Sequence, residues 1–206
     1  LFNEFMILFI LLAFSLSITF MLGIRSFVNI WIGKENYILS YITVVFFTIT
    51  LFLNIIYYPL LALINSNGLF KDNKNHIFVC SSINVILSII LVIPFKINGI
   101  LFATALAFLV NIFLKTKLVS SKVLNGKHID LLKNYTLLIT IFILLGISLF
   151  KVEEIILGFN LNIITCVLLL GIIFVLIALI TFIILYITNK DTKNLLDRIK
   201  LIINRK

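Results

Sequence analysis

Long apolar runs separated by short polar stretches dominate the sequence. A helix needs roughly 20 apolar residues to cross the hydrocarbon core of a bilayer, and this length divides the chain into six predicted transmembrane helices. They cover about residues 5–24, 38–64, 76–95, 97–114 and 131–150, and a final span lies within 155–188 after an interfacial segment at 155–160. The fifth helix is the least regular, because Lys133 and Asn134 interrupt it.

A polar stretch of fifteen residues, SFVNIWIGKENYILS at 26–40, separates the first two apolar runs. It contains the only tryptophan of the chain, Trp31, and also Tyr37. Such amphipathic rings are enriched where a membrane meets water. Gly33, Lys34 and Glu35 have the composition of a polar turn. The stretch is therefore predicted to connect two transmembrane helices at a membrane surface.

The composition excludes a soluble globular domain, because 62% of the residues are hydrophobic and only 12% are charged, with a mean hydropathy of +1.24. Cys80 and Cys166 lie within apolar runs, without the spacing of a disulfide framework or a zinc site. Neither His76 nor His128 has a serine, cysteine or acid at catalytic spacing, and no predicted span has a carboxylate in its middle. We therefore expect no enzyme activity, no metal and no cofactor.

The basic residues divide unequally between the two sides of the predicted helices. One side has four, and the other side, with the C-terminal tail, has thirteen. Because lysine and arginine accumulate in cytoplasmic loops, the sequence predicts a multi-pass protein of the cell membrane with both ends cytoplasmic. The net charge of +9 follows mainly from this asymmetry and also favours attraction to anionic membrane lipids. A nucleic-acid partner is not needed to explain it. The four residues on the outer side are Arg25, Lys34, Lys96 and Lys151.

Uncharged polar residues recur at helical spacing within two of the predicted helices. Such stripes either form hydrogen bonds between helices or line a water-filled cavity. In the second interpretation, Arg25 is a further candidate, although snorkelling to the membrane surface explains its position at a lower cost in free energy. The cavity candidates are Asn54 and Tyr58 in the second helix and Asn84 and Ser88 in the third, whereas Gly99, Ala103 and Ala107 follow a small-xxx-small pattern typical of helix packing.

The chain divides into four predicted parts. Residues 1–114 hold the first four helices, and 115–134 form a basic cytoplasmic loop. Residues 135–188 hold two further helices, and 189–206 form a basic tail. Within the tail, leucine and isoleucine recur at an amphipathic spacing over 191–203, which predicts a short helix on the membrane surface.

Three motifs between residues 27 and 107 carry a resemblance to a known family. VNIWIGKENYILS, LLALINSNGLFK and INVILSIILVIPFKINGILFATALA follow in this order. Together they resemble the C-terminal region of polysaccharide biosynthesis proteins, the O-antigen and capsule flippases of the multidrug/oligosaccharidyl-lipid/polysaccharide exporter superfamily. The family pattern G-I-x-G-a-a-x-A-T aligns with Lys96 to Thr104. Here Lys96 replaces the first glycine, and Ile100 and Leu101 replace a pair of small residues.

The resemblance implies an all-helical integral membrane exporter of the fourteen-helix type, of which this chain would hold helices nine to fourteen. Its partners would be the preceding N-terminal helices of the same protein, membrane lipids and a lipid-linked oligosaccharide. The implied function is the export, by alternating access, of undecaprenyl-pyrophosphate-linked oligosaccharide for surface polysaccharide synthesis. Two alternatives remain open: a multidrug or other exporter of the same superfamily, and a membrane scaffold without transport activity.

Overall fold

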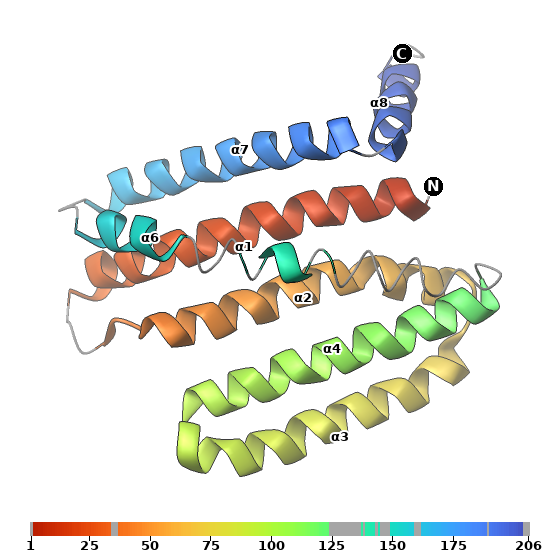
Figure 1. The fold of residues 1–206 in the computed structure, drawn as a ribbon, viewed down its shortest axis with the longest axis horizontal. Coiled ribbons are helices and arrows are strands. Elements are labelled where there is room, and N and C mark those ends of the chain that lie inside the picture. Colours follow the sequence, from red (N-terminus) through yellow and green to blue (C-terminus); the bar gives the residue numbers. More distant parts are fainter. Residues whose placement is uncertain are drawn as a thin grey trace.

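A computed structural model of the chain describes residues 2–33, 37–123, 137, 139–142, 144, 149–158, 162–188 and 190–203. Nearly all of these residues are helical, and none of them lies in a strand, so the all-α class is confirmed for the described part (Figure 1). The helices are α1 (Phe2–Ile32), α2 (Tyr41–Ser66), α3 (Phe70–Phe95), α4 (Ile97–Lys122), α6 (Phe150–Leu157), α7 (Ile163–Thr188) and α8 (Lys190–Ile203).

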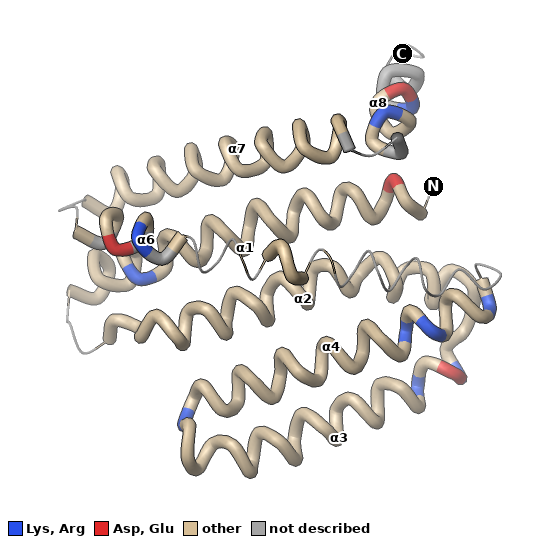
Figure 2. Tube along the Cα trace, viewed as in Figure 1, with Lys and Arg blue, Asp and Glu red and all other residues tan. Residues whose placement is uncertain are grey.

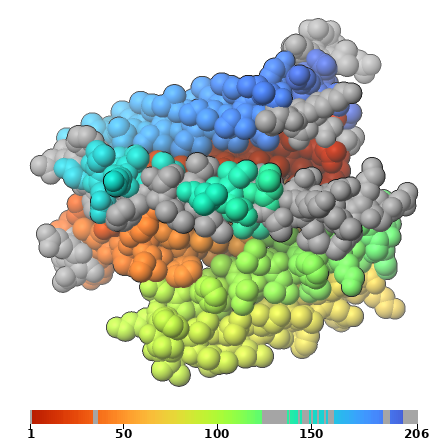
Figure 3. All heavy atoms as spheres, viewed as in Figure 1, coloured from red at the N-terminus to blue at the C-terminus, as the bar shows by residue number. Residues whose placement is uncertain are grey.

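Five of the described helices, α1, α2, α3, α4 and α7, are long and apolar enough to cross a membrane. They lie side by side in the order α7, α1, α2, α4, α3 (Figure 1). The space-filling view shows the same layers, with α7 along one edge and α3 with α4 along the other (Figure 3). Charged residues gather toward the two ends of this bundle (Figure 2). These features are those of a multi-pass membrane protein.

The predicted fifth span, 131–150, falls largely outside the described residues. Helices α4 and α7 run in the same direction along the bundle (Figure 1), so the chain between them has to return from one end to the other. Phe142, one of the few described residues of this stretch, is 3% exposed. Its ring stacks on Phe52 of α2 at a centroid distance of 4.0 Å and lies 5.8 Å from Phe14 of α1. A count of six spans stays a prediction.

Several predicted boundaries were wrong because the apolar length of a span is shorter than its helix. Helix α1 continues from the predicted end at Ile24 to Ile32, and α3 begins at Phe70 rather than His76. Helix α4 continues through Lys115 to Lys122, so residues 115–122 of the predicted basic loop are helical. Backbone hydrogen bonds extend a helix through polar residues that hydropathy excludes.

The predicted interruptions of the chain agree better with the structure. Helix α1 ends at Gly33, whose φ of +65° suits a glycine, and Ser40 caps α2 by accepting a hydrogen bond from the Thr43 backbone N–H. The run 155–188 is split as expected, because α6 ends at Leu157 and α7 begins at Ile163. The tail forms the predicted helix, α8. Its position on a membrane surface stays a prediction.

Both termini lie at the same end of the bundle (Figure 1). Helix α8 turns across this end, and its Arg198 forms an ion pair of 3.2 Å with Glu4 near the start of α1. The Thr192 hydroxyl donates to the Leu185 carbonyl oxygen at 3.0 Å, which ties the start of α8 to the last turns of α7.

Candidate functional site

Polar side chains follow the interface between α3 and α4, and we call this set the polar seam. The members from α3 recur every three or four residues and therefore share one helix face. The members from α4 show the same kind of spacing. The seam comprises Asn73, His76, Cys80, Ser81, Asn84 and Ser88 from α3, and Thr104, Asn111 and Lys115 from α4.

Asn84 is the centre of the hydrogen bonds in the middle of the seam. Its Oδ1 accepts from the Ser88 hydroxyl at 3.3 Å and from the Thr104 hydroxyl at 3.2 Å. The Thr104 hydroxyl has a second acceptor, the Ile100 carbonyl oxygen, at 2.9 Å. Since one hydroxyl has a single proton to donate, Thr104 can turn to either acceptor. Asn84 is thereby available to another hydrogen-bonding group.

A cavity of about 150 Å³ opens beside Asn84. It is large enough for several water molecules or for one small polar group. The Asn111 Oδ1 is buried and accepts no hydrogen bond from the described residues. The space is therefore suited to a polar occupant, although apolar helices surround it. Its lining residues are Cys80, Ser81, Asn84, Thr104, Ala107, Phe108 and Asn111.

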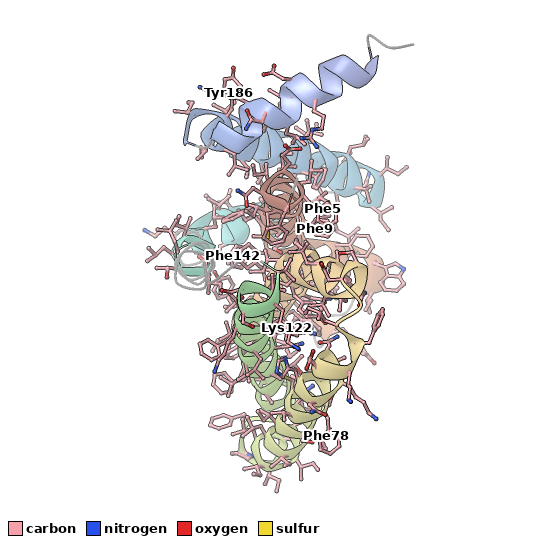
Figure 4. All side chains as sticks on the ribbon, turned by 90° about the vertical axis from the view of Figure 1, so that its right-hand side faces the viewer. Phe5, Phe9, Phe78, Lys122, Phe142 and Tyr186 are labelled. Carbon is pink, nitrogen blue, oxygen red and sulfur yellow. The ribbon has the colours of Figure 1, made fainter. Side chains whose placement is uncertain are left out.

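Lys115 lies one helical turn beyond Asn111, and its side chain is completely buried. Its Nζ donates to the Asn73 Oδ1 of α3 and lies 5.1 Å from the ring centroid of Tyr57 on α2. Three helices thus meet at one buried cation. Asp72 and Lys122 form an exposed ion pair at the end of the seam, with an N···O distance of 2.5 Å. Lys122 is labelled in Figure 4.

The structure brings together only part of the predicted cavity residues. Asn84 and Ser88 are in contact, as described above. Tyr58 is 46% exposed, and its ring lies 6.2 Å from Phe9 of α1, so it does not join the seam. Asn54 is half-buried on the α2 face that also carries Tyr57, which contacts α4. Arg25 is half-buried near the end of α1 and also lies apart from the seam.

The small residues of α4 allow a close approach of α3. A Cβ atom added to Gly99 would lie 2.2 Å from the Leu91 carbonyl oxygen, which is a severe overlap. Ala103 is completely buried, and Ala107 is 7% exposed. At the same corner, the Thr43 hydroxyl of α2 donates to the Asn98 Oδ1 at 2.8 Å. The seam is therefore held at a fixed separation of its two helices.

The sequence reasoning missed Lys115, Asn73 and Tyr57. Lys115 follows an apolar run, so it was interpreted as the start of a solvated loop. Its helical spacing from Asn111 was the one signal that could have placed it in a stripe. Its partner Asn73 is 42 residues away in the chain, and no local pattern identifies such a contact.

Among the described residues, no group of three or more histidine, cysteine, aspartate or glutamate side chains could hold a metal ion. Comparison of the chain with protein-family models, with curated proteins and with solved structures gives no match.

Proposed function

We propose that this protein exports undecaprenyl-pyrophosphate-linked oligosaccharide across the cell membrane for surface polysaccharide synthesis of the O-antigen, capsule or teichoic type. The observation that carries the proposal is the open cavity with polar lining residues between α3 and α4, two helices whose other faces are apolar. The motifs between residues 27 and 107 support it by their resemblance to flippases.

The physical argument concerns the glycan hydroxyls. A hydroxyl that leaves water without a new hydrogen bond loses roughly 1–3 kcal/mol on mutational scales, so the path of a glycan through a membrane needs polar walls. Asn84, Ser81 and Thr104 provide both donors and acceptors at the cavity. The alternative acceptors of Thr104 allow hydrogen bonds within the seam to be exchanged for hydrogen bonds to a sugar.

Deletion of the gene in its own organism tests the proposal. Surface polysaccharide should fall strongly, and the lipid-linked oligosaccharide should accumulate on the cytoplasmic side of the membrane. Normal surface polysaccharide together with loss of drug or dye efflux would instead identify a multidrug exporter. Loss of neither activity would favour a membrane scaffold.

Asn84→Leu tests the cavity itself. Leucine has the same number and branching of side-chain heavy atoms as asparagine but cannot exchange hydrogen bonds with Thr104 or a sugar, so export should fall at least several-fold while the protein level is kept. Val85→Leu is the matched control, because Val85 is adjacent on α3 and 57% exposed. It should export at the wild-type rate. Wild-type export by Asn84→Leu would show that the glycan does not pass along the seam.

A further inference from the structure

The ammonium group of Lys115 has no carboxylate partner among the described residues. Asp72 pairs with Lys122, and Glu4 pairs with Arg198. The contacts of Lys115 are the neutral Asn73 oxygen and the Tyr57 ring face. An ammonium has three N–H donors, and Asn73 accepts only one of them. A buried cation of this kind is stabilised when an anion lies beside it and accepts its remaining hydrogen bonds.

The space for an anion lies next to Lys115 along the seam. The cavity ends at Cys80 and Asn111, and Asn111 is one helical turn from Lys115. Rotation about the side-chain bonds of the lysine can carry Nζ toward this end. The lining has no carboxylate that would repel an anion.

The donors around this space match an oxyanion. The lining provides the Asn111 amide N–H and the hydroxyls of Ser81 and Thr104. The Lys115 ammonium and the Tyr57 hydroxyl lie outside the lining, next to Asn111. One cation among several neutral donors suits a tetrahedral phosphate group, whose oxygens accept several hydrogen bonds. The cavity volume of about 150 Å³ accommodates such a group.

We propose that Lys115, Tyr57 and Asn111, with the cavity of the polar seam, form a binding site for the terminal phosphate group of a membrane lipid. A lipid is the favoured source because the cavity opens between membrane-spanning helices, where free phosphate has to cross hydrocarbon to arrive. The site goes beyond the proposed export and does not depend on it, since any membrane lipid that ends in an uncapped phosphate group, unlike phosphatidylcholine, can occupy it.

Thermal unfolding of the purified full-length protein in neutral detergent tests the site. The probes are dihexanoyl phosphatidic acid, dihexanoyl phosphatidylcholine and inorganic phosphate at equal ionic strength. Phosphatidic acid at about 100 times its dissociation constant should raise the unfolding temperature by roughly 5–10 °C. Phosphatidylcholine and inorganic phosphate should raise it by less than about 1 °C. If inorganic phosphate raised the unfolding temperature as much as phosphatidic acid, the proposal that the bound phosphate belongs to a lipid would be wrong.

Two variants locate the site, and a third is the control. Lys115→Met removes the cation without leaving an unpaired charge, and Asn111→Leu fills the near end of the cavity. Both should abolish the rise with phosphatidic acid. Lys122→Met removes an equal charge from the same helix, but Lys122 is exposed and paired with Asp72, so this control should keep the wild-type rise. A wild-type rise in Lys115→Met, or no rise in the wild-type protein, would overturn the site.

Discussion

Lys96 joins α3 to α4 in a backbone conformation that favours glycine. Its φ is +51° and its ψ is −131°, and it is the only non-glycine residue with positive φ in the described part of the chain. A side chain in such a conformation destabilises a fold by roughly 1–3 kcal/mol.

Lys96→Gly should therefore stabilise the protein by about 1 kcal/mol or more, because glycine adopts this conformation without strain. The measurement is thermal unfolding in detergent. Lys117→Gly is the matched control, since Lys117 is exposed on regular helix α4, where glycine destabilises by about 1 kcal/mol. Destabilisation by both variants would mean that the corner is not strained.

Gly99 and Gly171 provide a second comparison between single residues. Alanine at Gly99 would overlap the Leu91 carbonyl oxygen, whereas a Cβ at Gly171 has no atom within 4 Å. Gly99→Ala should destabilise the protein by roughly 1–3 kcal/mol, because two backbones have to separate. Gly171→Ala should be neutral or slightly stabilising. Equal unfolding temperatures for the two variants would contradict the close contact of α3 and α4.

Among the helices, α8 is held to the bundle by few contacts, which makes its attachment easy to test. Arg198 is half-exposed, so its ion pair with the largely buried Glu4 is discounted for solvent screening to about 0.5–1 kcal/mol. Glu4→Gln and Arg198→Gln should each increase amide hydrogen exchange in residues 190–203 by roughly 2- to 5-fold.

A charge reversal is the control for this pair. Combining Glu4→Arg with Arg198→Glu restores opposite charges and should return the exchange rate toward the wild-type value. If the double variant exchanged as fast as either single reversal, α8 would be held by contacts other than the ion pair.

The sequence predicted the existence of most helices but not their ends. Apolar runs identify the part of a helix that fits hydrocarbon, and the corner between Phe95 and Ile97 followed from that rule. The first turns of α3, which include Lys71, Asp72 and Lys74, are too polar to be identified as helical from an apolar run. They form a helix because Asp72 and Asn73 contact residues of α4, a tertiary effect that no single run contains.

For the whole molecule, the arrangement of the helix ends predicts which loops share a side of the membrane. The corner between α3 and α4, with Lys96, and helix α6, with Lys151, lie at one end of the bundle (Figure 1). The start of α3, with Lys74, and the end of α4, with Lys122, lie at the other (Figure 1). With the positive-inside rule, single cysteines at Lys96 and Lys151 should react with an impermeant thiol reagent in intact cells. Those at Lys74 and Lys122 should react only after permeabilisation.

The labelling background lacks Cys80 and Cys166, both of which are free and buried. Labelling of a cysteine at Lys122 from outside would contradict an orientation with both ends cytoplasmic. Labelling at Lys96 but not at Lys151 would contradict a return of the chain between α4 and α6, and with it the count of six spans.

Only part of the candidate site could be predicted from the sequence. Helical spacing identified Asn84 and Ser88, because a polar stripe on an apolar helix is a local pattern. It selected Tyr58 and missed Tyr57, which differ by one position and face α1 and α4 respectively. The choice depends on how α2 is rotated between its neighbours, and this follows from packing of the whole bundle.

The pairing of α3 with α4 also bears on how the protein is made. Helix α3 packs almost entirely against α4, and its seam residues find most of their partners there. When only α3 has been synthesised, these polar side chains face lipid without their partners from α4. We expect the translocon to retain α3 until Thr104, Asn111 and Lys115 have emerged, so that the two helices enter the membrane together as a hairpin.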